Sequence, residues 1–360
     1  MQTVKRSDME KLAQYREWLY QNPRLTYLFF ELTDACNLSC LHCGSDACPQ
    51  NNTFLPAEAI KTVLDQVAAA FSPQSIMICL TGGEPLLHPQ LFECIVYAKK
   101  LGFSCGITTN GTLIDPTVAD RLTASGVDSV TFSLDGLADT HDRFRNKAGT
   151  FEKTVQGIGN LVRSSRRQIK TQITTVVHRG NQHQLEELFV LSCDLGVDSW
   201  RVINLEPIGR ALEHRELLLD GKELRDLLGF IREKRYSVHT PIDVTYGCSH
   251  YLTGDFERTV RDNYFLCGSG IFVASVLCSG DIYSCLDIER RPELVQGNIY
   301  RDNFADVWKN RFQIFRRDRS QDCRQCRQCD KRMFCCGDAA HTWDYNAKQP
   351  LLCVKELWEE

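Results

Sequence analysis

Three cysteines stand close together near the N-terminus. Cys36, Cys40 and Cys43 follow the apolar run TYLFFEL with the spacing C-x3-C-x2-C. A structural zinc site takes four ligands, usually as two separated pairs, and this stretch offers no such second pair. A four-iron cubane also takes four ligands, but one of its irons can be left for another molecule to bind. The spacing of the triad thus raises the question of what fills the fourth position.

A second group of cysteines lies in the C-terminal third. Cys267 is followed by twelve residues, then Gly280, four more residues and Cys285. A C-x2-C-x5-C stretch and a last cysteine follow: Cys326, Cys329, Cys335 and Cys353. The chain holds 18 cysteines, but its N-terminus is polar and has no apolar core of a signal peptide. In a chain of 360 residues this indicates metal or redox chemistry rather than an exported disulfide framework.

Charge and hydropathy exclude other classes of function. The formal net charge is −4, so we expect no nucleic-acid partner. No apolar run reaches the length of a membrane span, so we expect no membrane association and a cytoplasmic location.

Strand and helix patterns alternate along the first two thirds. Short apolar, β-branched runs are followed by amphipathic helical patterns, six times in a row. The expected strands are 26–33, 75–81, 104–109, 129–135, 170–177 and 200–205, and the expected helices are 56–71, 89–101, 116–125, 151–163, 182–195 and 222–234. The pattern predicts an α/β fold, a partial (β/α)6 TIM-like barrel followed by a small cysteine-rich domain. We expect a helical lead-in over 1–25, the barrel over 26–238 and the cysteine-rich domain over 239–360.

Polar residues gather where the expected strands end. They come from TGGEPLL, TTNG, SLDG and HDRFR, and are Gly82, Gly83, Glu84, Asn110, Ser133 and Arg145. Adjacent glycines let a ligand approach the backbone, and a carboxylate beside them can hold an ammonium group. The carboxyl ends of parallel strands meet at one edge of a sheet, so these residues should surround the cysteine triad.

With these motifs the sequence resembles the radical S-adenosylmethionine (SAM) enzymes over nearly its whole length. The resemblance implies that Cys36, Cys40 and Cys43 bind three irons of a [4Fe-4S] cluster, and that SAM chelates the fourth iron. It implies further roles for the strand-end residues: Gly82, Gly83 and Glu84 for the methionyl amine, Ser133 and Arg145 for the carboxylate, Asn110 on the same rim, and His42 near the adenine. Turn capping and a surface ion pair are the alternative for Ser133, Asn110 and Arg145.

The C-terminal third resembles the SPASM extension of these enzymes, which carries auxiliary [4Fe-4S] clusters. The resemblance assigns four cysteines to a distal cluster, Cys326, Cys329, Cys335 and Cys353, and two to a proximal one, Cys267 and Cys285. Ala339 stands where the family has a further cysteine. Four cysteines remain as possible substitutes: Cys336, Cys323, Cys278 and Cys248. A zinc ribbon over 323–353 is the alternative.

The resemblance implies reductive cleavage of SAM and hydrogen abstraction from a substrate. We expect an oxidoreductase that modifies a ribosomally made peptide. The alternatives are a sulfatase maturase, a small-molecule or sugar dehydrogenase, and a non-catalytic iron–sulfur electron carrier. Leu286 disfavours the sulfatase maturase, because that family has an aspartate at this position. Asp281 and Asp287, which flank Cys285, are the candidate bases.

An electron donor is expected besides the peptide. A low-potential electron donor of the flavodoxin or ferredoxin type would reduce the cluster. Only about 25 residues precede the first strand, too few for a leader-binding domain, so we expect recognition of the peptide to need a separate leader-binding protein or none.

Overall fold

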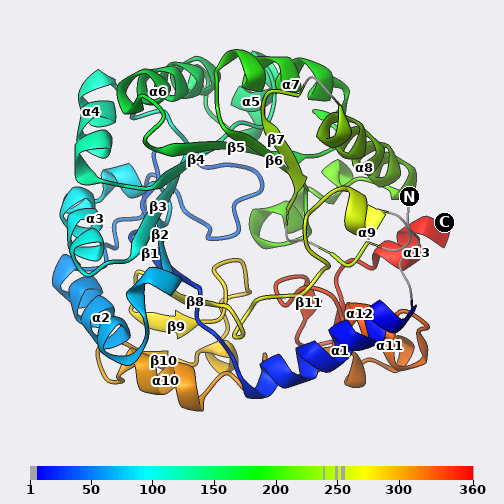
Figure 1. Ribbon diagram of the computed structural model, residues 1–360. Coiled ribbons are helices and arrows are strands. Elements are labelled where there is room, and N and C mark those ends of the chain that lie inside the picture. Colours follow the sequence, from blue (N-terminus) through cyan, green and yellow to red (C-terminus); the bar gives the residue numbers. More distant parts are fainter. Residues whose placement is uncertain (1–5, 238–239, 248–249, 253–255, 360) are drawn as a thin grey trace.

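The computed structural model describes residues 6–237, 240–247, 250–252 and 256–359. All six expected strands are present and pair in parallel, each with the next along the chain. They are β1 (Tyr27–Glu31), β2 (Met77–Thr81), β3 (Ser104–Thr109), β4 (Ser129–Ser133), β5 (Lys170–Val177) and β6 (Ser199–Asn204). The strands curve around the interior while helices cover their outer face (Figure 1). The expected α/β barrel class is confirmed.

The six expected helices are also present. They are α2 (Ala57–Ala70), α3 (Leu91–Lys100), α4 (Pro116–Ser125), α6 (Thr150–Ser165), α7 (Leu185–Asp194) and α8 (Gly221–Tyr236). In α2, residues Ile60, Val63, Leu64 and Val67 recur every three or four positions and are buried, as expected of an amphipathic helix packed on a sheet. The sequence did not predict α5 (Ala138–Phe144), a short helix directly after β4.

Local signals explain where a helix such as α4 begins and ends. Asp115 caps its start by accepting a hydrogen bond from Val118 N, and Pro116 occupies the first turn. Gly126 ends the helix with a φ of +75°, a left-handed conformation that glycine adopts without strain.

The cysteine-rich part continues the barrel sheet. β7 (Asp243–Tyr246) pairs in parallel with β6, and β8 (Val273–Val276) pairs in parallel with β1. β9 (Asp281–Tyr283) and β10 (Gly297–Asn298) then add an antiparallel edge, so the sheet has ten strands in the order β10-β9-β8-β1-β2-β3-β4-β5-β6-β7. The expected division at residue 239 therefore falls inside one continuous sheet, with strands of the later segment on both of its edges.

Short elements complete the C-terminal part. They are α9 (Phe256–Thr259), α10 (Phe304–Asn310), α11 (Arg324–Gln328), α12 (Arg332–Cys335), α13 (Val354–Glu359), and a hairpin of β11 (Trp343–Asp344) and β12 (Gln349–Pro350). In the described part of the chain, no helix has the length and apolar character needed to cross a membrane.

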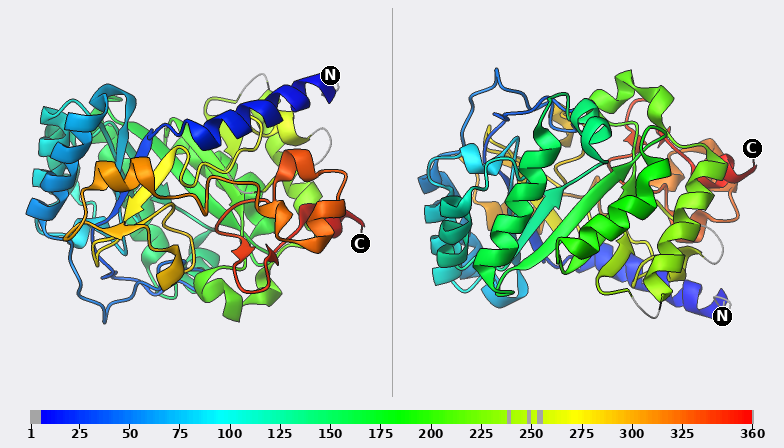
Figure 2. Two further views of the ribbon diagram at one scale, coloured as in Figure 1. Left: turned by 90° about the horizontal axis from the view of Figure 1, so that it is seen from below. Right: turned by 90° about the horizontal axis from the view of Figure 1, so that it is seen from above.

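The N-terminal helix packs against the cysteine-rich segment. Figure 2 shows α1 (Arg6–Gln21) at the same end of the molecule as α11, α12 and α13. The buried Arg16 side chain of α1 donates hydrogen bonds to Met333 O (2.9 Å) and Phe334 O (2.7 Å) and contacts Cys336 Sγ. The lead-in helix thus satisfies carbonyl groups of α12, which would otherwise lack partners at a helix this short.

Two glycines of α8 make a matched test of how α13 packs. A Cβ on Gly221 would lie 1.6 Å from Leu357 O of α13, whereas a Cβ on Gly229 would meet nothing within 4 Å. Gly221→Ala should destabilise the protein by about 1–3 kcal/mol through overpacking. Gly229→Ala should instead stabilise it by about 1 kcal/mol, because alanine favours a helix interior. Urea unfolding and proteolysis of the C-terminal helix measure both effects; equal stability of the two variants would contradict this packing.

Candidate active site

The cysteine triad lies in a loop at the carboxyl end of β1. Cys36, Cys40 and Cys43 pack together in one small apolar cluster with Leu38 and Ala47. Burial raises the pKa of Cys36 to about 12, and it also raises the pKa of Cys40. Without a bound metal, the thiols of Cys36 and Cys40 therefore stay protonated. They must lose their protons when they ligate a metal cluster. Such a dry, crowded set of thiols suits a cluster rather than a reactive nucleophile.

The TGGE loop after β2 packs directly on the backbone that leads into the triad. Gly83 N donates to Thr33 O (2.7 Å) and Glu84 N donates to Ala35 O (2.9 Å). A Cβ on Gly82 would lie 2.5 Å from Thr33 O, and one on Gly83 would lie 2.1 Å from Ala35 O. Both glycines are thus required for backbone contact between the ends of β1 and β2.

Glu84 is fully buried beside the triad. Its carboxylate accepts hydrogen bonds from Leu86 N (3.1 Å), Thr109 Oγ1 (2.7 Å) and Asn110 N (2.8 Å). Burial raises the pKa of Glu84 to about 7, although these hydrogen bonds and Arg145 oppose the shift. A carboxylate in such a place is stabilised by a cation that binds next to it. Asn110 itself donates to Asn37 Oδ1 (2.8 Å) and points its Nδ2 toward Cys36 Sγ (4.0 Å).

Arg145 lies between an aspartate and the triad. It forms a buried ion pair with Asp135 and approaches Cys40 Sγ at 3.6 Å. Asp135 also accepts a hydrogen bond from Val176 N (2.8 Å). From the resemblance, Ser133 and Arg145 are expected to hold a ligand carboxylate together; in the structure Arg145 is also engaged by Asp135, two residues after Ser133. Arg145 Nε is buried and has no hydrogen-bond partner, so one edge of the guanidinium group is available to an anionic ligand.

A stack of three rings covers the same site. His42 lies on Phe144 with ring centroids 4.2 Å apart, and Phe144 lies on His178 at 4.1 Å. Burial lowers the pKa of His42 well below its usual value, so the ring is neutral. His42 Nδ1, His141 Nε2 and His178 Nε2 are buried without hydrogen-bond partners. Unpaired buried polar atoms are rare in folded proteins, so this group fits a polar ligand bound beside the triad.

Four cysteines of the C-terminal part line a single cavity of about 370 Å³: Cys326, Cys329, Cys335 and Cys353. Cys326 lies in α11 and Cys329 directly follows it, while Cys335 ends α12 and Cys353 directly precedes α13. In the described residues, no group of three or more His, Cys, Asp or Glu side chains is arranged to hold a single metal ion. Four thiols around an open space are instead what a multi-iron cluster requires.

Two family models match the chain: the Radical SAM superfamily over residues 30–191 and an iron-sulfur cluster-binding domain, SPASM, over 267–330. The AdoMet-dependent heme synthase of Methanosarcina barkeri is 31% identical over 353 residues, which is 91% of this chain and 95% of that protein. The chain belongs to the radical SAM superfamily. The mycofactocin maturase MftC of Mycolicibacterium smegmatis is 30% identical over 306 residues, 84% of this chain and 74% of that protein.

Solved radical SAM structures share the fold. Streptococcus suis SuiB bound to S-adenosylmethionine superposes with a TM-score of 0.74 at 16% identity, covering 98% of this chain and 84% of that one. The anSMEcpe structure with bound AdoMet and Cp18Cys peptide has a TM-score of 0.72 at 19% identity, covering 94% and 95%. The radical SAM and SPASM domains imply [4Fe-4S] clusters and SAM as cofactors. The triad with its unpaired polar neighbours, and the cavity lined by cysteines, fit these groups.

The surroundings of Cys267, which is assigned to the proximal auxiliary cluster, fit an iron–sulfur cluster less well than the distal cavity does. Cys267 Sγ accepts a hydrogen bond from Ala340 N (3.3 Å), and the side chain of Ala339, where the family has a cysteine, is buried. Burial opposes ionisation of Cys267, but Arg319 and backbone N–H groups outweigh it and lower the pKa of the thiol. The cavity that Cys267 shares with Cys336 measures only about 10 Å³.

The possible substitute ligands are dispersed. Cys336 contacts Arg16, and Cys323 lies against the distal group, where its Sγ accepts a hydrogen bond from Cys326 N (3.3 Å). Cys278 lies near the end of β1, where its N–H donates to Glu31 (3.3 Å). Cys248 lies outside the described residues. Of these cysteines, Cys336 lines the same small cavity as Cys267, whereas Cys323 and Cys278 contact other parts of the described chain.

The two candidate bases differ in position. Asp281 begins β9 and accepts hydrogen bonds from Asn298 Nδ2 (2.8 Å) and Ser279 Oγ (2.9 Å), as a turn residue does. Asp287 is exposed and lies near the triad loop, because a Cβ on Gly44 would be 3.6 Å from its Oδ1. The structure thus brings Asp287, but not Asp281, next to the loop that carries Cys43.

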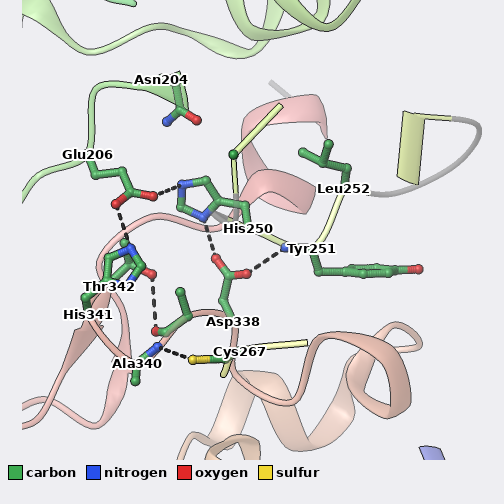
Figure 3. Close-up of polar contacts among 12 residues, drawn as sticks. Asn204, Glu206, His250, Tyr251, Leu252, Cys267, Asp338, Ala340, His341 and Thr342 are labelled. Atoms are coloured by element: carbon green, nitrogen blue, oxygen red, sulfur yellow. Dashed lines mark hydrogen bonds and ion pairs between the residues drawn. The ribbon is translucent and has the colours of Figure 1, made fainter. Parts of the chain in front are cut away.

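Sequence reasoning missed a buried polar cluster between the barrel and the cysteine-rich part (Figure 3). It consists of Glu206, His250, Asp338 and His341, whose side chains are linked in series. Glu206 follows β6 and so stands at the same edge of the sheet as the other strand-end residues, a signal that could have revealed it. Nothing in the spacing of the two histidines or of Asp338 indicated that they meet.

Replacing the triad tests its assignment. The variant with Cys36, Cys40 and Cys43 all changed to alanine should lose 5′-deoxyadenosine formation and about four irons, the content of one cubane. Wild type should hold about eight irons with one auxiliary cluster or about twelve with two, at four per cubane. Iron analysis and chromatography of 5′-deoxyadenosine measure these quantities. Continued SAM cleavage by the variant, or stoichiometric zinc in wild type, would refute the assignment.

The pKa of Glu84 makes a separate prediction. An ammonium group beside Glu84 requires the ionised carboxylate, and in the ligand-free protein this form is lost as the pH falls through about 7. SAM affinity should therefore fall by up to about tenfold per pH unit below 7, because the competing proton must be removed. Glu84→Gln should bind SAM weakly and without this dependence, whereas the exposed Glu58→Gln should behave as wild type. A wild-type Kd that is constant between pH 5.5 and 7 would show that Glu84 does not hold the amine.

Proposed function

We propose that this radical SAM protein oxidises a peptide substrate by two electrons. The observation that carries the proposal is the cavity lined by Cys326, Cys329, Cys335 and Cys353. A second iron–sulfur cluster there can take the electron that remains after a hydrogen atom has been removed from the substrate. Such an electron acceptor is needed for a net oxidation and has no use in a redox-neutral rearrangement.

The residues around the triad would bind and orient the cosubstrate. When bound, the cluster and SAM supply a 5′-deoxyadenosyl radical by reductive cleavage. Glu84 is placed to hold the methionyl amine, and the free edge of Arg145 is placed to hold the carboxylate. The neutral ring of His42 offers a flat surface for an adenine, and the buried rings behind it exclude water. Gly82 and Gly83 keep Glu84 against the triad loop.

The peptide class is supported by the similarity to mycofactocin maturase MftC, which extends over 84% of this chain. The proposal includes a low-potential donor of the flavodoxin or ferredoxin type, because the triad cluster must be reduced before it can cleave SAM. It also includes recognition of the peptide with the help of a separate leader-binding protein, and a cytoplasmic location. Leu286 argues against sulfatase maturation as the particular peptide reaction.

A second candidate substrate is an iron porphyrin. The AdoMet-dependent heme synthases of Nitratidesulfovibrio vulgaris and Methanosarcina barkeri match this chain almost from end to end, at 29% and 31% identity. These matches cover a larger share of this chain than the match to the peptide maturase does, and this difference favours a porphyrin as substrate. An auxiliary cluster as electron acceptor is compatible with oxidation of either substrate.

Parallel incubations distinguish the two substrates. Reduced enzyme and SAM are mixed with a precursor peptide encoded beside the gene, with iron porphyrins, or with sugars and alcohols. We expect a mass change of the peptide coupled to 5′-deoxyadenosine, because the electron acceptor allows a net oxidation. Mass spectrometry of every arm measures the outcome, and the triad-to-alanine variant is the control. Turnover of porphyrin alone would replace the peptide with the second candidate.

A further inference from the structure

Four titratable side chains form a buried chain of contacts between the barrel and the cysteine-rich part (Figure 3). His341 Nε2 lies 2.8 Å from Glu206 Oε2, and Glu206 Oε1 lies 3.2 Å from His250 Nε2. On its other side, His250 Nδ1 lies 2.5 Å from Asp338 Oδ2. Asp338 is fixed in turn by a hydrogen bond from Tyr251 N (2.8 Å). The result is an ordered series, His341–Glu206–His250–Asp338.

This series lies between the proposed metal sites. The loop that begins at Glu206 continues to Gly209 and Arg210, and Arg210 donates to Cys43 O (3.1 Å) through its backbone and to Cys40 O (2.8 Å) through its side chain. On the side of the cysteine-rich part, the backbone N–H of Ala340, which precedes His341, donates a hydrogen bond to Cys267 Sγ (3.3 Å). Asp338 follows Cys335 of the distal group by three residues. A substrate that reaches from the triad toward the auxiliary cysteines would therefore pass close to the series.

Burial decreases toward one end of the series. The side chain of His250 is fully buried and that of Asp338 is 4% exposed, whereas Glu206 and His341 are each 9% exposed. His250 and Asp338 both have left-handed backbone conformations, with φ of +46° and +66°. Non-glycine residues are strained there and persist only where surrounding contacts hold them. The inner pair, His250 and Asp338, thus holds Glu206 in place, and the outer pair, Glu206 with His341, is the more exposed part of the series.

We propose that the Glu206–His341 pair accepts the proton that the substrate loses during oxidation. This rests on the proposed function. A substrate C–H bond would give its hydrogen atom to the 5′-deoxyadenosyl radical, which would leave a carbon-centred substrate radical. One electron would then pass to an oxidised iron–sulfur cluster of the auxiliary class, and one proton would pass to His341, whose ring Glu206 holds through its carboxylate. The substrate has then lost two electrons and two hydrogens.

This pair suits the task better than the two aspartates that flank Cys285. Asp281 is engaged in a turn by Ser279 and Asn298, and Asp287 is exposed to water. A histidine held by a buried carboxylate is a common arrangement for proton transfer, because the carboxylate fixes the ring and stabilises its charged form.

The test uses Glu206→Gln and His341→Gln, with a matched pair as control. His214 and Glu216 are also a histidine and a carboxylate in contact, at 3.5 Å, but both are much more exposed. Reconstituted enzymes are given SAM, reductant and, in separate arms, the peptide, iron porphyrins, or sugars and alcohols in D₂O. In the arm that wild type turns over, the Glu206 and His341 variants should still form 5′-deoxyadenosine but lose about a hundredfold in product. The recovered substrate should then contain deuterium, because its unoxidised radical is quenched.

A second measurement needs no substrate. ¹⁵N NMR of histidine-labelled holoenzyme should show the His341 ring protonated at Nε2 in wild type, and a mixture of tautomers in Glu206→Gln. His214→Gln and Glu216→Gln should match wild type in every assay. Parallel loss of 5′-deoxyadenosine and product, unchanged product in either variant, or an unchanged His341 ring in Glu206→Gln would overturn the proposal. Turnover of only a non-peptide substrate would instead refute the peptide proposal. The amount of product per 5′-deoxyadenosine in that arm would still test the role of the Glu206–His341 pair.

Discussion

The close backbone contact between the ends of β1 and β2 is the constraint on which the site depends. Thr33 and Ala35 accept hydrogen bonds from the two residues that follow Gly82, and no side chain fits between the two segments. Because of this contact, the loop with the triad and the loop with Glu84 form one unit. The position of Glu84 relative to Cys36 is therefore set by main-chain geometry and does not depend on flexible side chains.

Burial of charge around this unit then determines its chemistry. Arg145 is enclosed by Asp135 and Cys40, Glu84 is protonated more readily than an exposed glutamate, and His42 is neutral. Buried groups of this kind are costly unless they are paired. Their remaining unpaired atoms, Arg145 Nε and His42 Nδ1 among them, mark where a zwitterionic cosubstrate would complete the pairing. The site is thus prepared for a ligand with an ammonium group, a carboxylate and a flat ring.

The cysteine-rich part is a structural continuation of the barrel. β8 extends the sheet beside β1 and β7 extends it beside β6, so strands of the later segment stand on both sides of the six-stranded core. In consequence, the loop after β6 contacts the triad loop through Arg210 and the C-terminal segment through Glu206. One short stretch of chain thus contacts both the triad loop and the segment that carries His341, which places the Glu206–His341 pair between them.

The sequence alone determined the alternating strands and helices, the triad and the strand-end polar residues, because these are local patterns whose periodicity and spacing are read directly. It also placed the four distal cysteines, which the structure arranges around one cavity. The tertiary structure decided what no local pattern contains. It paired Arg145 with Asp135, it joined β7 and β8 to the two edges of the barrel, and it brought Glu206, His250 and Asp338 together. Those partners are not adjacent in the sequence, so only the packing of the whole sheet brings them into contact.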